Sequence, residues 1–186
     1  MFEGKQVLLR SLELTDAETI NLQFNWLEVR RFLDMPYPSS LEDTKQWIKK
    51  TWEARKNHQY YLFAIEHTKL QQLLGVCGLM DISKINHKAE LMIVIYEDRN
   101  YDKGYGTEAL RLLLNFGFRQ LNLHRIVLFT HDINLRAQRV YEKIGFKPGG
   151  RRRQASFFEG AYHDLLLYDL LASEFLDVYA SARENK

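Results

Sequence analysis

The feature of this sequence that most limits its fold is a change of pattern after the apolar run that ends near Tyr96. Before this point, residues 60–66, 73–83 and 88–97 form apolar runs joined by short polar loops. These loops are too short for a crossover helix, so we expect the runs to pair as antiparallel strands. After this point the order is glycine-rich loop, helix, strand and helix. This order predicts an α+β fold whose sheet is mixed but mostly antiparallel.

Short capping motifs mark where the N-terminal helices are expected to begin. Thr15 and Glu18 have the spacing of a capping box, and so do Ser39 and Glu42. In this motif each side chain binds a backbone amide of the first helical turn that has no partner within the helix. A first strand is expected before both helices, at residues 6–10.

The second half of the chain predicts further helices and strands. The helix after the glycine-rich loop has an apolar stripe at three-to-four spacing, formed by Leu110, Leu113, Leu114, Phe118 and Leu121. Strands are expected at residues 124–130, 155–158 and 163–171. Asn134 is expected to cap a helix that ends at Gly145, where a left-handed conformation favours glycine.

The composition is typical of one folded, soluble domain. The chain has 186 residues, of which 46% are apolar, and its formal charge is only +2. A disordered chain lacks this apolar fraction, and a nucleic-acid-binding protein normally carries a larger basic excess. One cysteine excludes a disulfide framework and favours a reducing compartment, and no run approaches the ~18 apolar residues of a membrane span. We therefore expect a single domain over residues 1–186, in the cytoplasm, with no nucleic-acid or membrane partner.

The segment from Tyr101 to Thr107 has the composition of an anion-binding loop. Gly104 and Gly106 let backbone amides approach an anion, Lys103 adds a positive charge, and the helix N-terminus adds about half a charge. A tight strand-to-helix turn is the alternative interpretation, because a lone G-x-G pattern is common in turns. The dinucleotide fingerprint fits poorly, since antiparallel hairpins rather than βαβ units precede the loop. We expect the loop to bind a phosphate or pyrophosphate group.

Four segments with a particular order and spacing carry a family resemblance. They are residues 103–109 (KGYGTEA), residues 121–125 (LNLHR), the pattern Asn134-x-x-Ala137-x-x-x-Tyr141-Glu-Lys-x-Gly-Phe146, and Gly160-x-Tyr-x-Asp164. Together they resemble the GNAT superfamily of N-acetyltransferases, over about residues 7–176. The likeness is greatest to the branch with the ribosomal-protein N-terminal acetyltransferases and the spermidine acetyltransferases. It implies a sheet of about seven strands with helices on both faces, splayed at the strand that meets the cofactor.

The resemblance implies that acetyl-CoA is the acyl donor. Its pyrophosphate is expected on the glycine-rich loop, at Tyr101, Asp102, Lys103, Gly104, Tyr105, Gly106 and Thr107. Its pantetheine arm is expected to pair like a strand with Ile93, Val94 and Ile95. Family members also place an asparagine near this arm, which corresponds to Asn134. Its capping role alone would explain that residue equally well.

Asp102 departs from the family pattern, because relatives commonly have glycine at this position. A carboxylate beside a pyrophosphate is unfavourable unless it points outward or pairs with Lys103 or Arg99. This departure leaves a second interpretation open, in which the chain is a sensor that binds CoA or a nucleotide without turnover.

The resemblance also implies catalytic roles. Direct transfer needs an unprotonated amine, donors for the developing oxyanion and a proton for the leaving thiolate. Tyr141 is the expected proton donor, since a phenol pKa of about 10 keeps it protonated at neutral pH; it also fits the apolar stripe of its helix. Glu90 is a candidate general base, although a strand-end carboxylate that faces solvent is the slightly preferred interpretation. His131 and Asp132 are further candidates for this base.

The acceptor is expected to be a primary amine, either a protein N-terminus or a small molecule such as a polyamine. In the family the segment matching residues 31–40 borders the acceptor site, so we expect Phe32 and Tyr37 to shape it. Polyamine binding needs clustered carboxylates, for which the candidates are Asp34, Glu42, Glu90 and Glu159. Dimers are common in the family, so a homodimer is a further option.

Three other features are expected to carry no chemistry. The run Arg151-Arg152-Arg153 is interpreted as a solvated strand entry, although it could help to hold an acidic substrate or the CoA phosphates. No metal site is expected, because the six histidines lack paired spacing. Cys77 lies in mid-strand among small and apolar residues, so a buried, inert thiol is expected.

Overall fold

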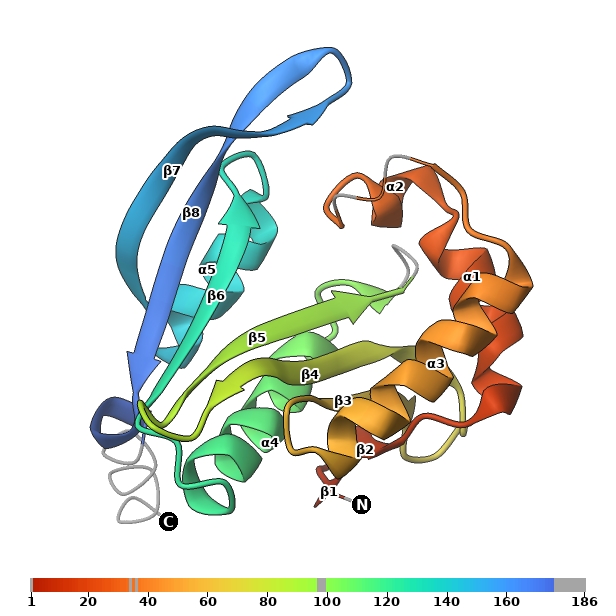
Figure 1. The fold of residues 1–186 in the computed structure, drawn as a ribbon, viewed down its shortest axis with the longest axis horizontal. Helices are drawn as coiled ribbons and strands as arrows, with labels where there is room; N and C mark the ends of the chain where they lie inside the picture. The colour runs from red at the N-terminus through yellow and green to blue at the C-terminus, as the bar shows by residue number, and fades with distance from the viewer. Residues whose placement is uncertain (1, 34, 36, 97–99, 176–186) are drawn as a thin grey trace.

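The computed structural model describes residues 2–33, 35, 37–96 and 100–175, which are arranged around one eight-stranded sheet (Figure 1). The strands are β1 (Phe2–Glu3), β2 (Val7–Ser11), β3 (Tyr61–His67), β4 (Leu73–Ser83), β5 (Lys88–Ile95), β6 (Arg125–His131), β7 (Lys147–Phe158) and β8 (Ala161–Leu171). The helices are η1 (Leu14–Asp16), α1 (Ala17–Phe24), α2 (Leu27–Arg30), α3 (Leu41–Lys56), α4 (Tyr105–Arg119) and α5 (Leu135–Ile144).

The sheet has the order β1-β2-β3-β4-β5-β6-β8-β7. Every neighbouring pair is antiparallel except β5 and β6, which are parallel. The predicted mixed, mostly antiparallel α+β fold is therefore confirmed. The strand beyond the expected seven is β1, which has two residues and is too short for alternation to reveal it.

Two apolar cores cover the two faces of the sheet around β5 (Figure 1). Leu91 and Ile93 pack in the core that contains α4, whereas Met92 and Val94 pack in the core that contains α1 and α3. Successive side chains of a strand point to opposite faces. This explains the uninterrupted apolar run of β5 and confirms that helices cover both faces.

The sheet opens between β5 and β6. These strands pair only at Lys88 with Arg125, Ala89 with Ile126 and Glu90 with Val127. Beyond these positions they diverge into a V, which Figure 1 shows between the green and cyan strands. The expected splay at this strand is therefore confirmed, and it begins immediately after Glu90.

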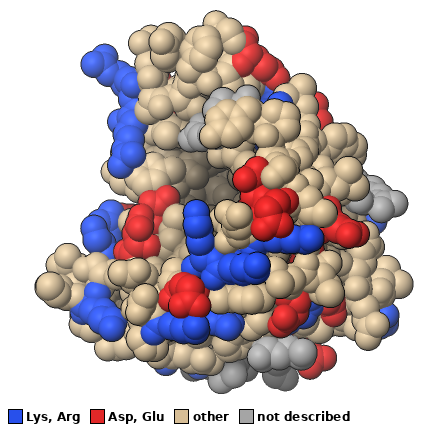
Figure 2. All heavy atoms as spheres, turned by 45° about the vertical axis from the view of Figure 1, so that its right-hand side comes forward, with Lys and Arg blue, Asp and Glu red and all other residues tan. Residues whose placement is uncertain are grey.

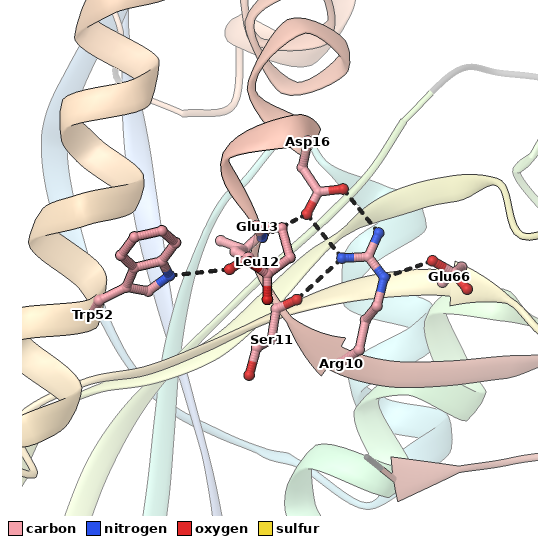
Figure 3. A network of polar contacts seen from close by, with 7 residues as sticks. All are labelled: Arg10, Ser11, Leu12, Glu13, Asp16, Trp52 and Glu66. Atoms are coloured by element: carbon pink, nitrogen blue, oxygen red, sulfur yellow. Dashed lines mark hydrogen bonds and ion pairs between the residues drawn. The ribbon is translucent and has the colours of Figure 1, made fainter.

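A polar network fixes the first helices to the sheet (Figure 3). Arg10 of β2 binds Glu66 of β3 at 2.5 Å and both oxygens of Asp16 at 2.8 Å. These two carboxylates raise the pKa of Arg10 against the opposing effect of burial. The indole of Trp52 on α3 donates to the carbonyl of Leu12 at 3.0 Å. The network holds η1, α1 and α3 on one face of the sheet.

The first capping-box prediction is wrong. Glu13 and Asp16 form the box, at the start of η1, and α1 begins only at Ala17. Asp16 is held in this position because its carboxylate also binds Arg10. Thr15 lies inside the 3-10 turn and does not cap α1.

The second capping-box prediction is displaced by one residue. Ser40 and Asp43 form the box, with the Ser40 hydroxyl accepting from the Asp43 amide at 3.1 Å and the Asp43 carboxylate accepting from the Ser40 amide at 2.9 Å. The amide of Ser39 donates instead to Asn25 Oδ1 at 2.8 Å. A contact with a residue distant in sequence therefore decided between two adjacent serines.

The predicted ends of α5 are confirmed. Asn134 Oδ1 accepts from the amide of Ala137 at 3.2 Å, and Gly145 ends the helix with φ of 113°. The last hairpin turns at Glu159 and Gly160, which both have positive φ, as a tight two-residue hairpin turn requires. Within the described residues, no helix is long and apolar enough to cross a membrane.

Candidate active site

The V between β5 and β6 holds a cleft of about 570 Å³. Its walls come from β5, from residues 100–102 and 104–107, from the ends of β6 and α2, and from one face of α5. Figure 2 shows a hollow on one face of the molecule, with acidic and basic side chains mixed around it. The site is therefore assembled from both arms of the splayed sheet.

The structure brings most of the expected site residues together at this cleft. Those that line it are Phe32, Glu90, Ile93, Val94, Ile95, Tyr101, Asp102, Gly104, Tyr105, Gly106, Thr107, Asn134 and Tyr141. Lys103 and Tyr37 are not among the lining residues, and Tyr37 is 72% exposed. Arg99 and Asp34 lie outside the described residues.

The N-terminus of α4 opens into the cleft without a side-chain cap. Gly104 is its N-cap residue, with φ of 86°, and no side chain of the described chain satisfies its first amides. A Cβ on Gly106 would lie 3.4 Å from Ile95 Cγ1, so glycine lets α4 approach β5 closely. Uncapped amides together with the helix dipole bind an anion. The loop therefore fits a pyrophosphate without needing Lys103.

Glu108 fixes the position of this helix end. Its carboxylate accepts from the backbone amides of Lys5, Gln6 and Val7 at 2.5, 2.9 and 3.2 Å. These bonds join the first turn of α4 to the start of β2. The anion site is therefore held by the sheet and does not depend on the loop alone.

The backbone edge of β5 along the V suits an extended ligand. From Leu91 to Ile95, β5 pairs with β4 on one side, and no described strand pairs with its other side. Unpaired backbone donors and acceptors of this kind add a further strand readily. The edge therefore fits an extended amide-containing chain, such as the pantetheine arm.

The backbone explains why Asp102 stands where glycine is common. Asp102 has φ of 57°, a left-handed conformation that costs glycine little and that aspartate tolerates better than most residues. The residue is exposed at the cleft wall. The departure from glycine therefore preserves the loop conformation and changes its charge.

Three cationic side chains on α5 line the cleft beside the glycine-rich loop. Arg136, Arg139 and Lys143 are all exposed there, and Arg136 Cζ lies 3.2 Å from the centroid of the Tyr101 ring. Sequence reasoning missed them, although their spacing of three and four residues places them on one helix face. They add positive charge next to the uncapped end of α4.

Tyr141 lies on α5, where it belongs both to the core and to the cleft wall. It is 7% exposed and packs against the rings of Phe146 and Tyr168, yet it also lines the cleft. Burial raises its pKa to about 12, so the hydroxyl stays protonated at neutral pH. The core and cleft interpretations of this residue hold together.

Glu90 lies at the apex of the V, where the pairing of β5 and β6 ends. It is half-buried, and burial raises its pKa, with Asp81 adding to the shift and Arg152 opposing it. A carboxylate with a raised pKa is a better base than an exposed one. Glu90 is therefore partly shielded from solvent, and its role as the base stays a prediction.

The comparisons with known proteins agree with this geometry. A family model described as an acetyltransferase (GNAT) domain matches residues 6–147. The chain belongs to the GNAT acetyltransferase family. It is 29% identical over 175 residues to the spermidine N(1)-acetyltransferase of Vibrio cholerae serotype O1, covering 94% of this chain and 98% of that protein. It is 32% identical over 177 residues to YdaF of Bacillus subtilis strain 168, provisionally named a ribosomal N-acetyltransferase, covering 92% and 94%.

Solved GNAT structures share the whole architecture. A crystal structure of spermidine N-acetyltransferase from Vibrio cholerae in complex with CoA and spermine has a TM-score of 0.83 and 26% identity, covering 93% of this chain and 99% of that one. In the present chain, the uncapped α4 end and the open β5 edge offer backbone groups of a kind that suits CoA. The chain is an acetyl-CoA-dependent N-acetyltransferase.

The end of the cleft away from the glycine-rich loop is lined by α2 and its following turn and by the end of β6, and the β7–β8 hairpin contacts this region from outside. Phe32 lines the cleft and contacts the ring of His131. Arg31 binds Glu28 and Glu159 at 3.4 Å each, so it joins α2 to the hairpin turn across the mouth of the V. Asp132 lies 3.8 Å from His163. Of the described acids proposed for a polyamine site, only Glu90 lines the cleft.

The expectation of an inert cysteine is confirmed. Cys77 is fully buried on β4, and burial raises the pKa of its thiol, which disfavours the thiolate that an acyl-enzyme would need. No group of three or more histidine, cysteine, aspartate or glutamate side chains suited to a metal ion occurs in the described part of the chain.

Proposed function

We propose that this cleft transfers an acetyl group to a primary amine by direct attack, with both substrates bound. The observation that supports this proposal is the meeting of an open strand edge, an uncapped helix end and a buried tyrosine in one cleft. When bound, acetyl-CoA supplies an acetyl thioester. The α4 amides hold its phosphates, with Arg136, Arg139 and Lys143 nearby, and the β5 edge holds its extended arm.

Tyr141 and Glu90 divide the proton transfers. Glu90 accepts a proton from the amine, directly or through water, because its half-buried carboxylate has a raised pKa. Tyr141 holds a proton at Oη for the leaving thiolate, because burial keeps its phenol neutral. Asn134 uses Oδ1 for its cap, which leaves the side-chain NH₂ group to donate into the cleft.

The relatives suggest two classes of acceptor. Their names assign spermidine to one group and ribosomal targets to another, and both acceptors present a primary amine. We propose that this protein likewise acetylates a protein N-terminus or a small amine such as a polyamine. We also propose a cytoplasmic location, in keeping with a single cysteine, and dimerisation, which size-exclusion chromatography with light scattering would test.

Thiol release from acetyl-CoA in the presence of a panel of amines tests the proposal. Cys77 is buried, so a thiol reagent would detect released CoA with little background from the protein. We expect release that depends on the amine, together with a matching gain of acetyl mass on the acceptor. Tight CoA binding without release for any amine would favour the sensor interpretation instead.

A further inference from the structure

One arginine extends the acceptor side of the cleft. Arg152 on β7 pairs with Leu165 of β8, which pairs in turn with His131 of β6. Side chains directly opposite each other in a sheet share a face, so Arg152 and His131 lie in one row on one face. His131 lines the cleft. The row of His131, Leu165 and Arg152 therefore runs from the cleft wall to the edge strand β7.

The Arg152 guanidinium folds back toward the cleft. Its Cζ lies 4.2 Å from the centroid of the Phe129 ring, and Phe129 lines the cleft two residues before His131 on the same face. A guanidinium stacked on an aromatic ring keeps its N–H donors free at its edge. Arg152 is therefore positioned at the rim of the cleft, although its backbone belongs to an exposed strand.

Glu90 faces the same space. Met92 and Val94 pack on the α1 and α3 side of the sheet, so Glu90, two residues earlier, faces that side too. Ile126 and Leu128 pack on the α4 side, which places Phe129 on the side of Glu90. The charge of Arg152 also lowers the pKa of Glu90. An amine beside Glu90 is therefore close to the guanidinium.

The surrounding charges distinguish Arg152 from its neighbours. Arg151 points to the opposite face and binds Asp164 at 3.3 Å, while Arg31 binds both Glu28 and Glu159. Arg152 makes no ion pair with any carboxylate of the described residues. At the mouth of the cleft, the Arg31 guanidinium is thus shared between two carboxylates, whereas the Arg152 guanidinium has no carboxylate partner among the described residues. A cation in this position disfavours a polyamine.

We propose that Arg152 is a specificity-determining residue that binds a carboxylate of the acceptor, and that the acceptor is an amine with a carboxylate a few bonds from its nitrogen. The inference rests on the proposed acetyl transfer to a primary amine. The planar guanidinium matches a carboxylate with two parallel hydrogen bonds, while Glu90 faces the amine. A polyamine would instead bring a second ammonium group against Arg152, where like charges repel.

Matched acceptors separate the two sources of such a carboxylate. L-phenylalanine against L-phenylalaninamide tests a free amino acid, and an amidated Ser-Asp peptide against the amidated Ser-Asn peptide tests an acidic protein N-terminus. Spermidine is the polycationic probe. We expect kcat/KM of the native enzyme to be about tenfold higher for the carboxylate member of at least one pair. The amide member of that pair cannot make the charged bidentate contact with Arg152.

Substitution of the arginine completes the experiment. Arg152→Gln is expected to bring that ratio close to one and to raise kcat/KM for spermidine about threefold, because it removes a nearby cation. Arg151→Gln is the matched control, since it removes the same charge from the other face and is expected to leave the ratio unchanged. Thermal unfolding confirms that both variants fold.

Each of the following results would contradict one part of the proposal. An equal ratio in the native enzyme and in Arg152→Gln would overturn the role of Arg152, as would an equal fall in Arg151→Gln. A strong native preference for spermidine that is unaffected by Arg152→Gln would overturn the acceptor class. Absence of thiol release with every amine would instead overturn the proposed function itself.

Discussion

The two sides of the cleft are built in different ways. The cofactor side comes from two continuous segments, the one from β5 into α4 and the one that forms α5. The acceptor side comes from α2, the apex of β5, the end of β6 and the β7–β8 hairpin. Local motifs therefore describe the first side, and only contacts between distant segments create the second.

This difference predicts how readily single substitutions change the choice of acceptor and the choice of acyl donor. The cofactor side relies on backbone amides and an open strand edge, whose geometry depends little on the side chains present. The acceptor side relies on individual side chains such as Phe32, Glu90 and Arg152. Single substitutions are therefore expected to alter acceptor choice more readily than the identity of the acyl donor.

Tyr141 lies on α5, on the cofactor side, and its substitution has the largest expected effect. Tyr141→Phe keeps the ring in the core but removes the hydroxyl proton, so kcat is expected to fall at least about tenfold, because a positioned acid contributes roughly 10²–10⁴-fold. Both KM values should change less than about twofold. Steady-state kinetics with both substrates varied gives these values. Tyr168→Phe is the control, since its hydroxyl binds Glu142 at 3.1 Å outside the cleft; unchanged kcat in Tyr141→Phe would remove the assignment.

The pH dependence of kcat/KM tests the role of Glu90 on the acceptor side. If Glu90 is the base, kcat/KM falls as pH drops through its raised pKa, and Glu90→Gln should lower kcat/KM by about tenfold at neutral pH and abolish this acidic limb. Asp81→Asn removes a charge that raises the pKa of Glu90, so the acidic limb of the kcat/KM profile of this variant should move to lower pH. Arg152→Gln removes a charge that lowers that pKa, so its limb should move to higher pH. A pH–rate profile retained in Glu90→Gln would exclude Glu90.

Arg136 tests the cofactor side. Arg136→Gln should raise KM for acetyl-CoA about fivefold, equivalent to ~1 kcal/mol for one lost phosphate contact, and leave KM for the amine unchanged. The effect should shrink at high salt, because exposed charges are screened. Arg111→Gln on the exposed face of α4 is the control. A larger change in the amine KM than in the acetyl-CoA KM would contradict the division into two sides.

The smallest expected effect is at Asp102. Asp102→Gly removes a carboxylate from the phosphate loop and suits the positive φ, so KM for acetyl-CoA should fall about two- to threefold. Asp102→Asn separates the causes, because it keeps the side-chain size and loses the charge. Isothermal titration with CoA measures both variants. A lower CoA affinity in both would show that the carboxylate supports the loop.

Much of the fold follows from local patterns. The three hairpin strands before the glycine-rich loop, most of the apolar stripe of α4 and both ends of α5 depend on residues close together in the chain, and they are confirmed. The strand expected at residues 155–158 is wrong in its start, because β7 already begins at Lys147, and Leu121 lies beyond the end of α4.

The predicted positions of the two capping boxes were wrong because residues outside the local pattern bind there. Arg10 binds Asp16, and Asn25 binds the backbone amide of Ser39. Strand β1 has only two residues, which leave no periodic signal.

The cationic face of α5 shows the same limit at the site. The spacing of Arg136, Arg139 and Lys143 was visible in the sequence, but the direction of that face depends on how α5 packs beside β6. Tyr37 was expected at the site but does not line the cleft. Phe32, five residues earlier in the same segment, lines the cleft, whereas Tyr37 is exposed.

The sequence by itself determined the fold class, the glycine-rich loop and the Asn134–Tyr141 helix, because turn chemistry, periodicity and capping act over a few residues. It also carried the local chemistry of a CoA site, whose binding groups are largely backbone. Only the tertiary structure decided that Glu90 lies at the apex of the V, that Arg31 binds two acids at its mouth, and that Arg152 turns back over Phe129. These contacts join residues far apart in the chain, and their positions depend on strand register and on the splay of the sheet.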